Sequence, residues 1–195
     1  MTSFTPREIT GKWSKGYCLD LHTTSSTCVG QNECGHPQFE TVRTEIGELL
    51  YKLKYGSDRS VVAELAAAVE KLLKRWKPDV DLIVPVPPST PRATPPVLLM
   101  AEAISKKTGN PVANCVKRTR EIPQLKNVYN LEERLALLDG LHEVDKSVTR
   151  GKTILLFDDL YRSGATMNAI TTDLYKQGKA KDVVALTLTR TRSNE

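Results

Sequence analysis

The sequence predicts an α/β protein with a mostly parallel β-sheet flanked by helices on both faces. Short runs rich in β-branched residues alternate along the chain with amphipathic stretches of helical period. Helices between strands are the connections that parallel strands require. A length of 195 residues corresponds to about one domain. Because 39% of the residues are hydrophobic and 26% are charged, the composition excludes a disordered chain.

Four runs are expected to form the strands of this sheet. They cover residues 81–86, 111–116, 153–157 and 183–188. The third run is apolar without alternation, as is typical of a strand buried on both faces. Ligands of parallel sheets bind beyond the carboxyl ends of the strands. A functional site is therefore expected in the loops after Val86, Val116 and Phe157.

Apolar residues at helical spacing predict the helices. They cover residues 42–55, 60–77, 97–108 and 167–177. The second helix is expected to end before Pro78, because the residue that precedes a proline disfavours the α region. Gly56 is the expected end of the first helix, and Gly109 and Gly178 follow the other two at the usual left-handed stop position.

Composition changes near residue 40, where a stretch rich in Thr, Ser, Gly and Cys gives way to helical spacing. We therefore expect an irregular N-terminal appendage or hood over 1–40 and an α/β domain over 41–195. No stretch reaches the roughly 20 apolar residues that cross a bilayer, and residues 1–11 do not resemble a secretion signal. These features predict a cytoplasmic protein with no membrane partner. The net charge of +5 suits an anionic small molecule as well as nucleic acid.

The most informative stretch covers residues 154–166, which read as a buried strand, two acids, a small-residue turn and a helix start. Backbone N–H groups and hydroxyls of the turn can converge on one phosphate. The expected 5-phosphate contacts are Arg162, Ser163, Gly164, Ala165 and Thr166. Asp158 and Asp159 are placed to accept hydrogen bonds from sugar hydroxyls, so the stretch predicts a ribose 5-phosphate pocket. The alternative is that the two acids only cap the following helix.

This stretch resembles the phosphoribosyl pyrophosphate (PRPP) motif of type I phosphoribosyltransferases. From Glu45 to Arg190, the chain also resembles the ComF family of competence-associated phosphoribosyltransferase-like proteins. The resemblance includes the segment from Ile46 to Tyr55, the Val-Pro-Val-Pro strand ending at Pro87, and Gly151-Lys152 before the motif. It implies the Rossmann-like type I phosphoribosyltransferase fold, with Mg²⁺ brought by PRPP and no metal held directly by the protein.

The chain departs from that family at several positions. Arg162 replaces a Thr or Ser, and Arg92 is not followed by the family's Arg-Gly-Phe-Asn-Gln run. Leu137 and Leu141 stand where Asn and Phe are expected, and the paired Cys-x-x-Cys zinc module is absent. These departures favour a member of the family that has lost turnover, whereas the retained acids Asp158 and Asp159 favour an enzyme.

The loop after Val86 is the expected pyrophosphate loop. Its residues are Pro87, Pro88, Ser89 and Arg92. Type I enzymes contact pyrophosphate there through backbone N–H groups, which the two prolines lack. Ser89 and Arg92 are therefore the expected contacts. The alternative is a rigid turn that ends an ordinary strand.

A basic stretch resembles a mobile lid that closes over an anionic substrate. Its lid candidates are Arg118, Arg120 and Arg134. The alternative is a solvated loop. Tyr129 is the single aromatic residue there, so nucleic-acid binding is possible but not indicated.

The N-terminal forty residues contain five side chains of metal-ligand type. They are Cys18, His22, Cys28, Cys34 and His36. Their spacing matches no strong zinc signature, which favours free thiols and surface histidines. A zinc site is the alternative.

Two functional hypotheses follow. The first is a Mg²⁺-dependent phosphoribosyltransferase that moves 5-phosphoribosyl from PRPP to an unidentified nitrogenous acceptor, a base or an amine, and releases pyrophosphate. The second is a non-catalytic sensor of nucleotide or PRPP, or a DNA-uptake accessory protein of the ComF type. Asp158 and Asp159 would hold the ribose hydroxyls in both cases. The expected partners are PRPP, a small-molecule acceptor and a second copy in a homodimer.

Overall fold

A five-stranded sheet in the order β1-β2-β9-β8-β5 lies at the centre of the part of the chain that the structure describes. This structure is a computed structural model and describes residues 2–32, 34–89, 95–123, 128 and 130–192. The pairs β2/β9, β9/β8 and β8/β5 are parallel, and only the short β1 runs antiparallel to its neighbour β2. The expected α/β fold with a mostly parallel sheet is confirmed.

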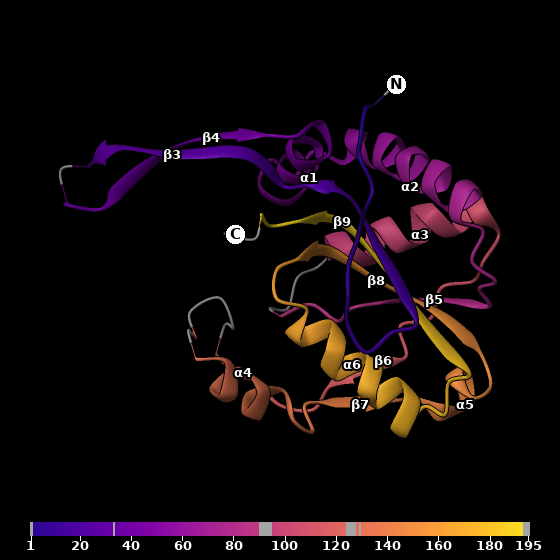
Figure 1. Cartoon of the computed structure of the whole chain (residues 1–195). Helices are drawn as coiled ribbons and strands as arrows, with labels where there is room; N and C mark the ends of the chain where they lie inside the picture. Colours follow the sequence, from indigo (N-terminus) through magenta and orange to yellow (C-terminus); the bar gives the residue numbers. More distant parts are fainter. Residues whose placement is uncertain (1, 33, 90–94, 124–127, 129, 193–195) are drawn as a thin grey trace.

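The elements follow one another along the chain as Figure 1 shows. The strands are β1 (Arg7–Glu8), β2 (Lys15–Leu21), β3 (Thr23–Gln31), β4 (Pro37–Arg43), β5 (Leu82–Pro85), β6 (Val116–Arg118), β7 (His142–Val144), β8 (Thr153–Tyr161) and β9 (Asp182–Arg190). The helices are α1 (Glu45–Tyr55), a 3₁₀ turn η1 (Arg59–Val61), α2 (Val62–Trp76), α3 (Pro96–Thr108), α4 (Leu131–Leu138), α5 (Lys146–Thr149) and α6 (Ala165–Lys176). The four expected helices are confirmed as α1, η1 with α2, α3 and α6.

Helices cover both faces of the sheet, with α1, α2 and α3 on one face and α6 on the other (Figure 1). Strand β8 divides its side chains between the two faces. Leu155 and Phe157 pack toward α1, α2 and α3, whereas Ile154 and Leu156 pack toward α6. This alternation with period two is the geometry of any strand, and both faces are apolar because both are covered. It also sets the faces of the polar residues that follow Phe157.

The expectation of an irregular segment over 1–40 is wrong. Residues Lys15–Leu21 form β2, which lies inside the sheet in parallel register with β9. Cys18 and Leu19 are both 0% exposed. The small Cys18 side chain therefore packs in the core. The polar composition of the segment does not indicate such a core position. Residues Thr23–Gln31 and Pro37–Arg43 then form a hairpin that projects from the body of the protein (Figure 1).

The expected strand over 111–116 is also wrong. Val112 makes one parallel bridge to Ile83, and Val116 begins β6, which pairs antiparallel with β7 in a separate two-stranded sheet. Ile83 donates to the Pro111 carbonyl and accepts from Ala113, at 2.8 and 3.0 Å. Pro111 has no N–H to extend this pairing toward the start of the run. The expected strands 81–86, 153–157 and 183–188 are confirmed as β5, β8 and β9.

Helix α1 is fixed closely against the end of β2. Thr44 caps the helix by accepting from the Gly47 N–H at 3.0 Å, and its hydroxyl donates to the Leu21 carbonyl at 2.6 Å. A Cβ on Gly47 would lie 2.1 Å from the His22 carbonyl oxygen. Only glycine allows this approach, which brings the last turn of α1 to the carboxyl end of the sheet.

None of the helices in the described ranges is long and apolar enough to cross a membrane.

Candidate functional site

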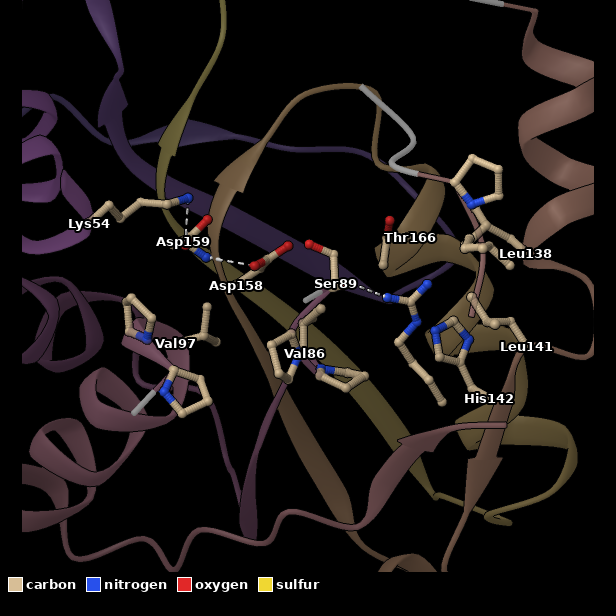
Figure 2. A pocket seen from close by; sticks show the side chains of 17 residues that line it. Lys54, Val86, Ser89, Val97, Leu138, Leu141, His142, Asp158, Asp159 and Thr166 are labelled. Carbon is tan, nitrogen blue, oxygen red and sulfur yellow. Dashed lines mark hydrogen bonds and ion pairs between the residues drawn. The ribbon is translucent and has the colours of Figure 1, made fainter. Parts of the chain in front are cut away.

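A cavity of about 310 Å³ opens at the carboxyl ends of β5 and β8, where parallel sheets bind their ligands. Figure 2 shows Lys54 and the two acids toward one end, His142, Leu138 and Leu141 at the other, and Ser89 between them. The cavity is lined by Lys54, Val86, Pro87, Pro88, Ser89, Pro95, Pro96, Val97, Arg118, Ile122, Pro123, Leu138, Leu141, His142, Asp158, Asp159 and Thr166.

Asp158 and Asp159 lie inside β8 rather than after it, since β8 continues to Tyr161. The backbone N–H of Asp159 donates to Asp158 Oδ1 at 2.8 Å. Asp159 Oδ2 lies 2.9 Å from Lys54 Nζ, an ion pair between β8 and α1. The structure therefore brings both expected acids to the cavity and adds a cation to one of them.

The two acids have different surroundings. Burial and then the neighbouring charge of Asp159 raise the pKa of Asp158 to about 8, although the Asp159 N–H and the Lys54 ammonium oppose this rise. At pH 7 Asp158 is therefore mostly neutral and can donate a hydrogen bond. Asp159 has the Lys54 ammonium as its counter-charge. A diol placed over the pair would meet one carboxyl group that is mostly neutral and one that is paired with an ammonium group.

The expected phosphate turn has the backbone that an anion site needs. Gly164 has φ +72° and precedes α6, and no side chain caps this helix end in the described structure. The first N–H groups of a helix have no partner within the helix, so here they are open to an anion. Arg162 and Ser163 are exposed, and Thr166 is the residue of this turn that lines the cavity.

The turn rests on Tyr161. The Tyr161 hydroxyl donates to the Thr10 carbonyl at 3.1 Å, and its ring meets that of Trp13 edge-on at 6.2 Å between centroids. A Cβ on Gly164 would lie 2.8 Å from Tyr161 Cε2. The turn is therefore held by contacts to the N-terminal segment.

The expected pyrophosphate loop lines the middle of the cavity. The N–H of Val86 donates to the Phe157 carbonyl at 2.9 Å, which ties the start of the loop to β8. Pro87, Pro88 and Ser89 follow along the cavity wall. Arg92 lies outside the described residues.

The three lid candidates have different surroundings. Arg118 lines the cavity, and its Nη1 donates to the Ser89 carbonyl at 2.7 Å. Arg120 donates to carbonyls at the end of α4, including that of Asp139 at 2.9 Å. Arg134 Nε donates to the Val128 carbonyl. Of the three, Arg118 is the one placed at the cavity. Arg120 and Arg134 instead make hydrogen bonds within the segment around α4.

Sequence reasoning missed His142 on β7. Its side chain is buried at the cavity wall, with Nδ1 3.5 Å from Asp173 Oδ2 on α6. Burial lowers the pKa of His142, and the charge of Asp173 opposes this shift. A lone histidine in a polar stretch gives no sequence signal. Lys54 was also given no role, although it lies in the segment of family resemblance.

The metal-ligand types of the N-terminal segment are spread over different surroundings. Cys18 is buried in β2, and burial raises its pKa to about 11, whereas Cys28 and Cys34 are exposed on the hairpin. His22 lies half-buried at the end of β2, with its Nδ1 3.2 Å from the Thr189 hydroxyl. Among the residues that the structure describes, no group of three or more His, Cys, Asp or Glu side chains is arranged to hold a metal ion.

Comparison with known sequences finds a relative, and no protein-family model matches the chain. The chain is 26% identical over 144 residues to the competence protein ComFC of Bacillus subtilis strain 168. The match covers 73% of this chain and 59% of that protein, so the chain spans about three fifths of the length of its curated relative.

The chain is also similar to solved structures. The glutamine PRPP amidotransferase from B. subtilis complexed with ADP and GMP is 18% identical with a TM-score of 0.51, over 80% of this chain and 34% of that one. An adenine phosphoribosyltransferase is 13% identical with a TM-score of 0.47, over 85% and 86% of the two chains. The chain is therefore similar in sequence to ComFC and has the fold of the type I phosphoribosyltransferases.

Proposed function

We propose that the chain is a PRPP-binding phosphoribosyltransferase that moves the 5-phosphoribosyl group to a nitrogenous base or amine and releases pyrophosphate. One observation carries the proposal: Asp158, Asp159 and the first turn of α6 at Thr166 face the same cavity. An acid pair suits a ribose diol, and an open helix start suits a phosphate. The cavity volume of about 310 Å³ is at the lower end of the range for small-molecule sites.

In this proposal each part of the cavity takes one part of PRPP. The turn at Gly164 binds the 5-phosphate, and Asp158 and Asp159 hold the ribose hydroxyls. Arg118 and the backbone near Ser89 face the pyrophosphate. The bond from C1 to pyrophosphate loosens first, so the protein mainly positions an electron-poor sugar and stabilises the departing charge.

The donor set fits a Mg²⁺ ion that PRPP itself carries. Mg²⁺ needs oxygen ligands in octahedral geometry and usually keeps several waters and substrate phosphate oxygens. Here Asp159 is paired with Lys54, and burial favours the protonated form of Asp158. Neither acid is a free carboxylate for direct ligation. When bound, the ion would supply positive charge to the pyrophosphate.

A non-catalytic sensor of PRPP or nucleotide, or an accessory protein of DNA uptake, is the second candidate. One observation favours it: Pro87 and Pro88 occupy the loop at the cavity wall and offer no N–H to pyrophosphate. Such a protein would keep the phosphate turn and the acids without turning substrate over.

The two candidates are separated by incubating the protein with PRPP, Mg²⁺ and a panel of purines, pyrimidines and amines while pyrophosphate release is followed. An enzyme releases pyrophosphate with at least one acceptor, and Asp159→Asn reduces this release. The exposed Asp79→Asn variant is the matched control and retains it. Calorimetric binding of PRPP without release with any acceptor supports the sensor. Absence of PRPP binding contradicts both the enzyme and the PRPP sensor.

A further inference from the structure

The ion pair between Lys54 and Asp159 links α1 to the acid pair. Lys54 comes from the last turn of α1, a helix whose start is fixed on β2 by Thr44 and Gly47. Its side chain is 23% exposed and that of Asp159 is 14% exposed. A pair so shielded from water is screened less by solvent and salt than an exposed pair. The contact therefore stands apart from the surface ion pairs of the protein.

Strand alternation explains why Lys54 reaches only one acid. Phe157 packs toward α1, α2 and α3, and Leu156 packs toward α6. Successive side chains of a strand point to opposite faces. Asp159 therefore lies on the same face as Phe157, and Asp158 lies on the same face as Leu156. Asp159 is thus turned to the face that α1 covers, as the dashed contact to Lys54 in Figure 2 shows.

We propose that Lys54 is a positioning residue of the ribose site. Its ammonium group holds the Asp159 carboxylate toward α1 as the charged member of the acid pair. The inference rests on the proposed function, since it concerns how the same site receives a ribose. In this arrangement Asp159 accepts a hydrogen bond from one ribose hydroxyl, while Asp158 remains the neutral partner. Two adjacent carboxylates that were both charged would repel each other and the anionic ligand.

The charged surroundings of the pair are mixed. Asp158 precedes Asp159 in β8, and its charged neighbours are Asp159 and Lys54. His22, at the end of β2, interacts with the charges of Asp159 and Lys54 and also with those of Arg43 and Arg162. Burial and then the charges of Arg43 and Lys54 lower the pKa of His22, so at pH 7 and above it adds little positive charge. Lys54 is a cation in direct contact with the acid pair.

The experiment compares the parent with Lys54→Met, Lys54→Arg and the control Lys52→Met, which removes an exposed lysine of the same helix. Calorimetry measures binding of ribose 5-phosphate between pH 7 and 9.5, where its phosphate group is mostly in the dianionic form. In parallel, ¹³C NMR follows the titration of the Asp158 carboxyl without ligand, and Asp158→Asn assigns the signal.

Lys54→Met is expected to weaken binding at pH 7 by about tenfold, the scale of one charge-assisted hydrogen bond. Parent affinity falls as pH rises through the titration of Asp158, because its ionisation adds negative charge opposite an anionic ligand. Since the Lys54 ammonium lowers the pKa of Asp158, its loss moves the titration and the affinity profile to higher pH. Lys54→Arg restores both, and Lys52→Met leaves both at parent values.

Two results would overturn the inference. The first is a Lys54→Met variant whose Asp158 titration and affinity profile are unchanged. The second is tighter binding by Lys54→Met, which would make Lys54 a blocking group. If Lys54→Met only destabilised the protein, its melting temperature would fall but the titration of Asp158 would not move. Lys54→Arg would not reverse such a loss. Absence of ribose 5-phosphate and PRPP binding in the parent overturns the proposed function instead, and the NMR titration still decides whether Lys54 acts on the acid pair.

Discussion

The ring of Tyr161 occupies the space that a side chain on Gly164 would need: a Cβ at this position would lie 2.8 Å from Tyr161 Cε2. Gly164 also has φ +72°, a conformation that β-branched residues rarely adopt. The turn before α6 therefore depends on a glycine for two independent reasons.

Gly164→Val is expected to abolish binding of PRPP and nucleoside monophosphates, because the turn must open to relieve both the clash and the strain. Calorimetry measures the loss, and circular dichroism confirms that the variant is folded. Gly164→Ala, which lacks the β-branch, is expected to lose less. Unchanged binding by Gly164→Val would place the phosphate away from this turn.

Gly47→Ala is expected to destabilise the protein by about 1 to 3 kcal/mol, the usual cost of overpacking. The new Cβ would lie 2.1 Å from the His22 carbonyl oxygen, a backbone atom that cannot move without shifting β2 or α1. This cost outweighs the helix propensity that alanine gains over glycine, about 1 kcal/mol. Urea unfolding measures it, with Lys52→Ala as the exposed control on α1. Equal stability of Gly47→Ala and the parent would show that α1 and β2 are not so closely fixed.

Asp158→Asn is expected to stabilise the protein at pH 8 more than at pH 5. Burial raises the pKa of Asp158 from 3.8 to about 8, so the folded state keeps a proton that the unfolded chain releases. Stability of the parent therefore falls as pH rises from about 4 to 8. The amide has no charge to bury and escapes this penalty, which is about 1.4 kcal/mol for each pKa unit.

Urea unfolding at both pH values measures this difference, and we expect a gain of at least about 2 kcal/mol at pH 8 relative to the parent. Exposed Asp79→Asn is the control and should show no such pH dependence. A gain from Asp158→Asn that is the same at pH 5 and pH 8 would contradict a raised pKa.

The sequence predicted the parts of the fold whose signal is local. The buried run before Asp158 and the amphipathic spacing of α3 and α6 are patterns within single elements, and all three are confirmed. The strand β2 was missed because its core positions are held by Cys18 and Leu19 between polar neighbours, and because its partner β9 is more than 160 residues away. Long-range pairing leaves little trace in a segment's own composition.

The same distinction applies to the site. Both acids and Thr166, which follows the turn at Gly164, lie close together in sequence, so their motif was visible, and all three line one cavity. Lys54 and His142 reach that cavity only because α1 and β7 dock beside β8 and α6. The face of β8 on which each acid lies depends on the register of the buried strand, which no motif states.

Calorimetric titration of PRPP into the parent, Asp158→Asn and Asp159→Asn tests the central claim that the acid pair is a ribose site. We expect Asp159→Asn, folded by circular dichroism, to weaken binding about 10- to 150-fold at pH 7, since a charge-assisted hydrogen bond contributes about 1.5 to 3 kcal/mol. Asp158→Asn should weaken it less, because the pKa of Asp158 near 8 makes this acid mostly neutral at pH 7. If both variants bind PRPP as tightly as the parent, the acids do not hold a ribose and the account is wrong.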